Sequence, residues 1–429
     1  MIRTPRDRNV RSGPSRRSVL NTGLAASSAA VLGLGTFIRP SRAADGSIKL
    51  GFVGPVTGNY AELGTAMRDG AQVAVDDINA KGGVKVGGKS YMIDLVIGDE
   101  ESTPEQALVA TNRLIDVAGV LGIVGYANST NLLAAMPLLQ DSKIPMIDTS
   151  GRADSIPRQI AEKKMDYLFQ LSPVNNDFVD LHGEIIKHYG QAKRVAILAF
   201  NTDYAREYTV YAEKLWPQKM PGVLVQSYFV EVSKMDLQSE LLQIRNFQPQ
   251  FLFVLLTGPQ SYQFVDQFDS AGMIKEMLVL GDSIYGSDLF RSKNGAKLDY
   301  HMANAITQKK PITTMTIPFY DSFFKKVGFN PPYYAVQTYD GMIMLLEGLA
   351  RMAKISGDVA SDRTALRDAL VSINAEKPVL GARGNLSFSS LETGRRVAVA
   401  PFVIQYQPNN TTEVVWPLDQ AGKFLDPRG

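Results

Sequence analysis

The sequence predicts an α/β protein built from two lobes, each organised around a parallel sheet. Strand-like and helix-like segments alternate from Ile48 onward, which is the order that produces a doubly wound parallel sheet. The alternation starts again after Ser172-Pro173. The 386 residues from Ala44 to Gly429 exceed what a single hydrophobic core usually supports, so we expect two lobes.

Residues 1–43 predict an export signal rather than a part of the fold. A twin-arginine pattern (SRRSVL, residues 15–20) follows a basic start and precedes a mildly apolar run, 20–37. Small residues before Ala44 place the cleavage site near Ala43. Two departures from the usual twin-arginine pattern leave Sec export as an alternative, and either route leads to the periplasm.

Composition excludes several classes of function. Without the first 43 residues, the chain holds 37 basic and 42 acidic side chains, a formal net charge of −5. A mildly acidic chain argues against nucleic acid as a partner. The sequence contains no cysteine, which excludes disulfides, thiolate nucleophiles and cysteine-ligated metals.

The first block of alternating segments runs to residue 147. Its expected strands are 48–53, 91–97, 117–124 and 144–147, and its expected helices are 61–79, 104–118 and 132–140. Apolar residues recur at helical spacing in the first helix, which ends at Gly82-Gly83 as glycine commonly ends helices. Pro104 suits the first turn of the second helix.

The second block follows a strand-like segment, 167–171, and a crossing at Ser172-Pro173. Its expected strands are 194–200, 223–230, 251–256 and 277–280, and its expected helices are 178–189, 204–216, 237–246 and 260–271. The chain is less regular after Tyr300, with expected helices at 316–327, 336–353 and 362–373, a turn at 381–385, a late strand at 397–405 and a polar tail from Pro408.

Two polar loops follow neighbouring strands of the first block. They carry Asn128, Ser129 and Thr130 after one strand, and Ser150, Gly151 and Arg152 after the next. Ligands of open α/β sheets bind beyond the carboxyl ends of the strands, so both loops should border one crevice. Hydroxyls, helix N-terminal amides and a guanidinium suit a carboxylate-bearing ligand. Each residue alone could cap a helix or carry a surface charge, but two such loops in tandem favour a site.

Eight stretches together carry a family resemblance: IKLGFVGPVTGNYAELG, AVDDINAKGG, DEESTPEQA, GIVGYANSTN, KIPMIDTSG, RVAILAFNTDYARE, QFLFVLLTG and FDSAGM. From about Ile48 to Asp419, the chain resembles the periplasmic branched-chain amino acid-binding proteins, the solute receptors of one group of ABC importers. The resemblance implies a type I periplasmic binding protein, with two Rossmann-like lobes that are joined by a three-segment hinge and close on a solute. It implies lobe 1 at 44–171 and 306–382, and lobe 2 at 172–305 and 383–429.

The resemblance also implies roles for residues at matching positions. Asn128, Ser129 and Thr130 match the loop that holds the ligand carboxylate, Ser150 and Arg152 fall in the next loop, Tyr60 and Tyr204 match cleft aromatics, Thr257 falls where relatives have an aromatic, and Asp282 falls near their amine-binding glutamate. Arg152 is a departure, since a guanidinium there would bind a carboxylate bidentately or crowd the pocket.

The ligand class depends on where the acidic residues point. The ammonium of an α-amino acid needs a carboxylate, because a buried unpaired charge is costly. Asp282 or Asp203 could serve. If both point elsewhere, the ligand lacks an amine, and an aromatic or aliphatic organic acid or an amide fits better. Both classes remain candidates, and Arg152 slightly favours the acid without an amine.

No catalytic constellation is present in the sequence. It has no His-Glu-x-x-His, P-loop or Gly-x-Ser-x-Gly pattern. The acidic segment 99–101 could hold a cation, but a strand end that faces solvent explains it better. We therefore expect a monomeric binding protein without cofactor or metal, whose partners are a small solute and a membrane permease. A ligand-sensing regulator of the same fold and a secreted enzyme are the alternatives.

Overall fold

A computed structural model describes residues 44–190, 192–305, 310–398 and 401–428, which belong to one compact unit of the chain. The expected export signal, 1–43, lies outside the described residues. Within the described ranges, none of the helices combines the length and the apolar character that crossing a bilayer requires.

The first sheet has the strand order β2-β3-β1-β4-β5-β6. Its strands are β1 (Gly46–Gly54), β2 (Val84–Val86), β3 (Lys89–Asp99), β4 (Ile123–Gly125), β5 (Met146–Asp148) and β6 (Leu168–Gln170). All neighbours pair in parallel except β2 and β3, which form an antiparallel hairpin. The intervening helices are α1 (Ala61–Ala80), α2 (Pro104–Asn112), α3 (Ser129–Asp141) and α4 (Ser155–Glu162). This is the doubly wound arrangement that the alternating sequence predicts.

The second sheet has the order β15-β14-β11-β10-β9-β7-β8. Its strands are β7 (Arg194–Phe200), β8 (Leu224–Val230), β9 (Phe251–Leu255), β10 (Leu278–Gly281), β11 (Met302–Ala305), β14 (Phe402–Gln407) and β15 (Thr411–Trp416). Strands β7 to β11 run parallel, and β14 and β15 add an antiparallel edge. Its helices are α5 (Asn175–Ile185), α6 (Asp203–Lys219), α7 (Gln238–Phe247), α8 (Pro259–Ser270) and α9 (Asp288–Asn294). The sequence therefore predicted the α/β class and the two sheets correctly.

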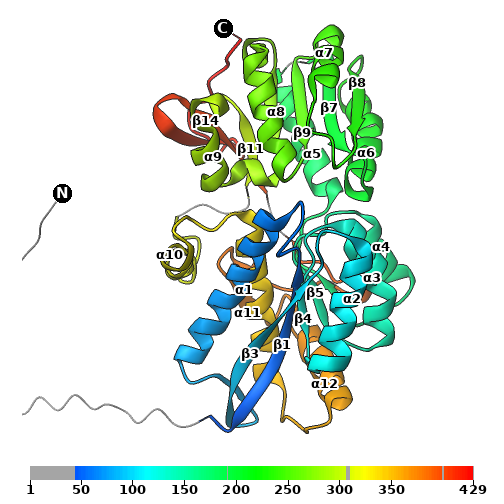
Figure 1. The fold of residues 1–429 in the computed structure, drawn as a ribbon, viewed down its shortest axis with the longest axis vertical. Coiled ribbons are helices and arrows are strands. Elements are labelled where there is room, and N and C mark those ends of the chain that lie inside the picture. The colour runs from blue at the N-terminus through cyan, green and yellow to red at the C-terminus, as the bar shows by residue number, and fades with distance from the viewer. Residues whose placement is uncertain (1–43, 191, 306–309, 399–400, 429) are drawn as a thin grey trace, which may run out of the picture. The chain divides into compact units, whose positions relative to one another are not determined.

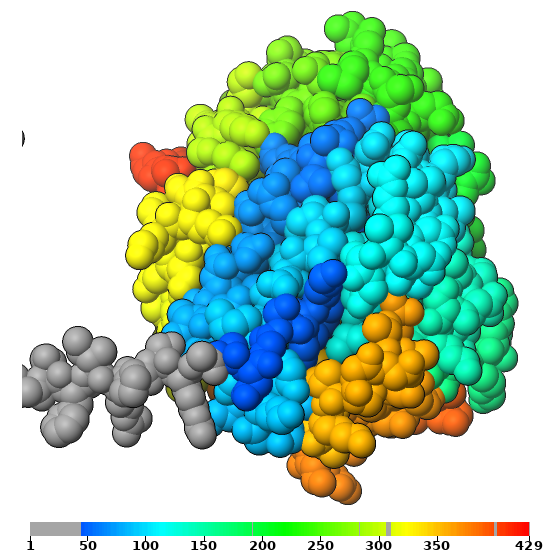
Figure 2. Space-filling view, turned by 60° about the horizontal axis from the view of Figure 1, so that its bottom comes forward, coloured from blue at the N-terminus to red at the C-terminus, as the bar shows by residue number. Residues whose placement is uncertain are grey.

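Helices from late in the chain return to the first sheet. They are α10 (Thr316–Val327), α11 (Tyr333–Arg351) and α12 (Val359–Val371). Figure 1 shows α1 and α11 on one face of the sheet and α2 and α3 on the other. Helices α1 and α11 pack so closely that a Cβ on Gly70 would lie 2.3 Å from the Ala335 carbonyl oxygen. Arg363 of α12 donates to the Val120 and Ile115 carbonyls. Figure 2 shows this late part of the chain, in orange, against early segments in blue and cyan.

Several expected elements differ from the structure. The apolar run 117–124 is not one strand, because a π-helical turn, Arg113–Ala118, continues α2 and leaves Val117 83% exposed, so that only Ile123–Gly125 forms β4. A left-handed Gly119 ends this turn. The sequence interpretation missed β2, α4, α9, β11 and β15 and named no strand at 379–386, where the structure has the hairpin β12–β13 (Val379–Leu380 and Asn385–Leu386). These missed strands and helices are short, so periodicity alone gives them little signal.

Candidate ligand-binding site

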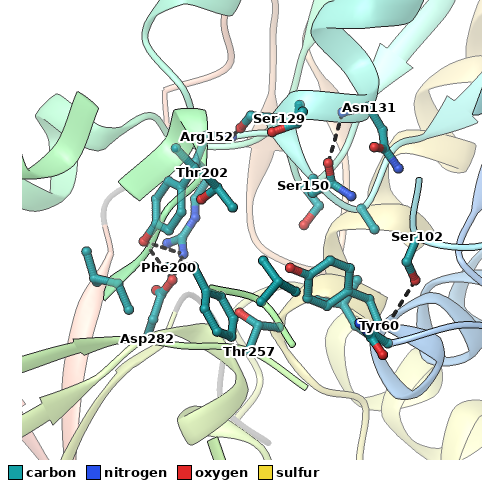
Figure 3. A pocket seen from close by; sticks show the side chains of 18 of the residues that line it. Tyr60, Ser102, Ser129, Asn131, Ser150, Arg152, Phe200, Thr202, Thr257 and Asp282 are labelled. Atoms are coloured by element: carbon teal, nitrogen blue, oxygen red, sulfur yellow. Dashed lines mark hydrogen bonds and ion pairs between the residues drawn. The ribbon is translucent and has the colours of Figure 1, made fainter. Parts of the chain in front are cut away.

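A cavity of about 440 Å³ lies beyond the carboxyl ends of the parallel strands of both sheets. Its lining residues are Asn59, Tyr60, Leu63, Ser102, Pro104, Ala127, Asn128, Ser129, Thr130, Asn131, Ser150, Arg152, Phe200, Thr202, Tyr204, Glu231, Val232, Ser233, Leu255, Thr257 and Asp282. Of the site residues predicted from the sequence, only Gly151 does not line it. We call the residues contributed by loops of the first sheet the first-sheet edge and those from the second sheet the second-sheet edge (Figure 3).

The N-terminus of α3 forms the polar part of the first-sheet edge. Asn128 caps the helix, because its side chain accepts a hydrogen bond of 2.9 Å from the Asn131 amide. The Ser129 hydroxyl oxygen accepts from the amides of Arg152 and Ala153, at 2.9 and 3.0 Å. With both lone pairs used, Ser129 has its proton to offer to a ligand. A helix N-terminus with such a hydroxyl suits a carboxylate.

Gly151 shapes the next loop rather than lining the cavity. Its amide donates to Asp148 Oδ1 at 2.8 Å, and its carbonyl accepts from Gln170 Nε2 at 2.7 Å. A Cβ at this position would lie 2.8 Å from Ile156 Cδ1 and 3.0 Å from Asp148 Oδ2, so a larger residue would have to push these side chains aside. Burial raises the pKa of Asp148 to about 8, although the amides of Ser150 and Gly151 oppose the shift. The loop thereby fixes the start of the Arg152 side chain.

Arg152 forms an ion pair with Asp282 across the cavity. The two side chains are 7% and 2% exposed. Tyr204 joins them, since its hydroxyl donates to Asp282 Oδ2 at 2.6 Å and accepts from Arg152 at 3.1 Å. Burial is the largest influence and lowers the pKa of Arg152, but Asp282, Tyr204 and Tyr333 together outweigh it, so the net shift of the pKa is upward. The two charges that the sequence offered to a ligand thus bind one another.

A buried polar chain supports Asp282 from behind. Asn304 of β11 lies 3.5 Å from Asp282 Oδ1 through its amide nitrogen, and its oxygen lies 2.8 Å from His182 Nε2. The Tyr208 hydroxyl lies 2.5 Å from His182 Nδ1. Burial lowers the pKa of His182 to about 4, so the ring is neutral at pH 7 and donates from Nε2 to Asn304. This chain holds Asp282 in one orientation.

Other contacts join elements of the first and second sheets nearer to solvent. Thr130 Oγ1 donates to Asp203 Oδ2 at 2.9 Å, so the second acidic candidate for a ligand ammonium also has a protein partner. Glu62 of α1 accepts from the Tyr262 hydroxyl at 2.7 Å and pairs with Lys293 at 2.8 Å. We call the Glu62, Tyr262 and Lys293 contacts the rim cluster.

Sequence reasoning missed polar lining residues that follow other strands. Ser102 follows β3, Thr202 follows β7 and Glu231 follows β8. The strand-end rule that identified the other loops would have found them. Glu100 corrects another expectation, because it does not face solvent: it is fully buried, and burial raises its pKa to about 8.

Residues 47–405 match the family described as periplasmic binding protein, and the chain belongs to this family. Among curated proteins, it is 26% identical over 353 residues to the Leu/Ile/Val-binding protein homolog 7 of Brucella abortus, covering 79% of this chain and 84% of the relative. It is 30% identical over 183 residues to an amino acid binding protein of Pseudomonas aeruginosa, covering 43% of this chain and 45% of the relative.

Solved structures show the same fold. A solute-binding protein of an R. palustris ABC transporter in complex with benzoate superposes with a TM-score of 0.74 at 21% identity, covering 86% of this chain and 95% of that one. The branched-chain amino acid transporter substrate-binding protein of Streptococcus pneumoniae in complex with isoleucine gives 0.72 at 22% identity, covering 86% and 100%. The chain therefore has the fold of substrate-binding proteins from branched-chain amino acid-type ABC transporters, and these relatives are binding proteins rather than enzymes.

Proposed function

We propose that this protein is the extracytoplasmic solute-binding component of an ABC importer and captures a small carboxylate-bearing solute. One observation carries the proposal: the cavity of about 440 Å³ joins a helix N-terminus and serine hydroxyls to the loops of a second sheet. Such a cavity is large enough to enclose an organic acid and supplies donors for its carboxylate. The carboxylate would bind the hydroxyls of Ser129 and Ser150 and the Thr130 amide in the first turn of α3.

The solute that fits best is an acid without an amine. Asp282 is paired with Arg152, and Asp203 accepts from Thr130, so both acidic candidates that the sequence offered already have a protein partner. Glu231, which also lines the cavity, accepts from the Asn201 side chain at 3.2 Å. Burying an ammonium without a carboxylate is costly. Aromatic acids are supported by a structural neighbour that holds benzoate, whereas another holds isoleucine, so amino acids remain the rival class.

Capture would take place by closure of two lobes, 44–171 with 306–382 and 172–305 with 383–429. Contacts that cross the cavity, such as Arg152–Asp282 and Thr130–Asp203, would form on closure and shift the population of states. Tyr60, Tyr204 and Thr257 would enclose the solute. The segment around Arg396 pairs with Gln170 of β6 in the first sheet, which favours a last crossing of the chain beyond Arg396 rather than at residue 382.

The protein would act in the periplasm as a monomer, after removal of residues 1–43 near Ala43/Ala44. The closed form would dock on a membrane permease that this chain does not contain. Mass spectrometry of the secreted protein tests the cleavage, and blocking the twin-arginine pathway tests the route.

A thermal-shift screen followed by calorimetry tests the proposed function. The panel contains L-leucine and other amino acids, benzoate and hydroxybenzoates, dicarboxylates, and amides. Binding of an acid, with loss of affinity in Ser150→Ala, would support the proposal. A purified protein that binds none of the acids, and instead turns over a substrate, would contradict it.

A further inference from the structure

Arg152 inserts its guanidinium into a cluster built to hold a cation. Its Cζ atom lies 4.7 Å from the centre of the Phe178 ring, 4.8 Å from that of Tyr204 and 5.8 Å from that of Tyr333. Asp282 supplies the negative charge, and Figure 3 shows Arg152 reaching it. Aromatic faces around a carboxylate are the arrangement that proteins use to bind guanidinium and ammonium groups. We call Asp282, Phe178, Tyr204 and Tyr333 the cation cage.

Three of the four cage residues come from a different part of the fold than their occupant. Phe178 lies on α5, Tyr204 on α6 and Asp282 after β10, whereas Arg152 follows β5 of the first sheet and Tyr333 begins α11, which packs on that sheet. The Arg152 backbone is anchored separately, because its amide donates to Ser129 at 2.9 Å and its carbonyl accepts from the Asn175 amide at 2.9 Å. Because Ser129 and Asn175 hold the backbone of Arg152, the cage has to hold only its guanidinium.

We propose that the cation cage is a binding site for an organic cation which Arg152 permanently fills, so that Arg152 determines specificity by excluding solutes with an amine. This inference rests on the proposed function only in assuming that the protein binds a small solute. A buried carboxylate such as Asp282 requires a cation beside it, and Arg152 supplies one from within the chain. An amino acid would have to displace that guanidinium, whereas an acid without an amine would bind Ser129 and Ser150 without disturbing the ion pair.

The first experiment removes the guanidinium from the cation cage and offers a free organic cation in its place. Arg152→Ala removes the guanidinium, and ethylguanidinium, which resembles the lost end of the side chain, is the probe. We expect ethylguanidinium at millimolar concentrations to bind Arg152→Ala at least tenfold more tightly than wild type in calorimetry, and to raise its melting temperature. Sodium chloride and urea at equal concentration serve as solvent controls. Arg158→Ala, which removes an exposed arginine on α4, is the matched variant and should behave as wild type.

Two further variants keep the test decisive. If Arg152→Ala does not fold alone, refolding with and without ethylguanidinium replaces the titration, and recovery only with the cation supports the cage. The double variant Arg152→Ala/Asp282→Asn leaves no unpaired carboxylate and should not respond to the probe. An equal response of wild type and Arg152→Ala, or an undiminished response of the double variant, overturns the cage.

Solute selectivity is measured separately with benzoate and L-leucine. We expect Arg152→Ala to gain at least tenfold in affinity for L-leucine relative to wild type. Wild type that binds L-leucine more tightly than every acid in the panel would refute the exclusion of amines. The ethylguanidinium result needs no solute, so a failure of the proposed function and a failure of the cation cage give different outcomes.

Discussion

The Arg152–Asp282 ion pair, which we call the central pair, and the rim cluster both join elements of the first and second sheets, but they differ in their access to water. The Arg152 and Asp282 side chains are 7% and 2% exposed, whereas Lys293 and Glu62 are 48% and 25% exposed. Water weakens the attraction between exposed charges, and burial strips both charges of water. The central pair is therefore costly to break, and the rim pair is not.

Loss of the central carboxylate should have the largest effect on stability. Asp282→Asn leaves the Arg152 guanidinium buried without its counter-ion, and we expect the free energy of unfolding to fall by about 3–5 kcal/mol. Urea denaturation followed by circular dichroism measures the change. Asp266→Asn, which removes an exposed carboxylate paired with Lys297, should change stability little. Equal losses in both variants would show that burial does not set the cost.

A buried acid without an ion pair extends the comparison to pH. Burial raises the pKa of Glu100 from its usual value of 4.5 to about 8, so the folded protein keeps a proton that the unfolded chain releases. The stabilising contribution is complete below about pH 4.5 and is lost as the pH rises to about 8, by at most about 1.4 kcal/mol per pH unit.

The isosteric variant Glu100→Gln isolates this titration from other groups. We expect the variant to match wild type near pH 5 and to be more stable than wild type near pH 8. Unfolding free energies at several pH values measure the difference. Curves that stay parallel from pH 5 to pH 8 would contradict a buried, protonated Glu100.

A neutral buried contact should cost less than either charge. Ser129→Ala removes the acceptor for the Arg152 and Ala153 amides, and we expect stability to fall by about 1–3 kcal/mol. It also removes a donor for the solute carboxylate, so acid affinity should fall about tenfold. Ser142→Ala, at the other end of α3, is the control for both measurements. Unchanged acid binding in Ser129→Ala would remove this hydroxyl from the binding site.

The sequence predicted the parts of the site that depend on local rules. The sequence shows where strands end and helices begin at Asn128, Ser129 and Ser150. Polar residues that directly follow a parallel strand lie at its carboxyl end, where ligands of such sheets bind. Tyr204 was found by resemblance, and the structure places it on the cavity wall.

The sequence could not predict interactions that depend on tertiary distance. Arg152 and Asp282 are 130 positions apart, and no local pattern shows that they pair with each other rather than with a ligand. Burial of Glu100 was hidden for the same reason, since its neighbours Asp99 and Glu101 suggest a solvated acidic turn. Charge patterns along a chain identify candidate residues, but the packing of both sheets decides which charges are already neutralised.

The rim cluster should give the smallest effect and the clearest dependence on salt. Lys293→Gln keeps most of the side-chain length but removes the charge beside Glu62, and we expect a loss of less than about 1 kcal/mol. Most of that loss should vanish at 1 M salt, where the screening length falls to about 3 Å. Asp282→Asn should keep its full cost there, because salt does not reach a buried pair. If the Lys293→Gln loss were large and independent of salt, water would not be weakening the rim pair, and the distinction between centre and rim would fail.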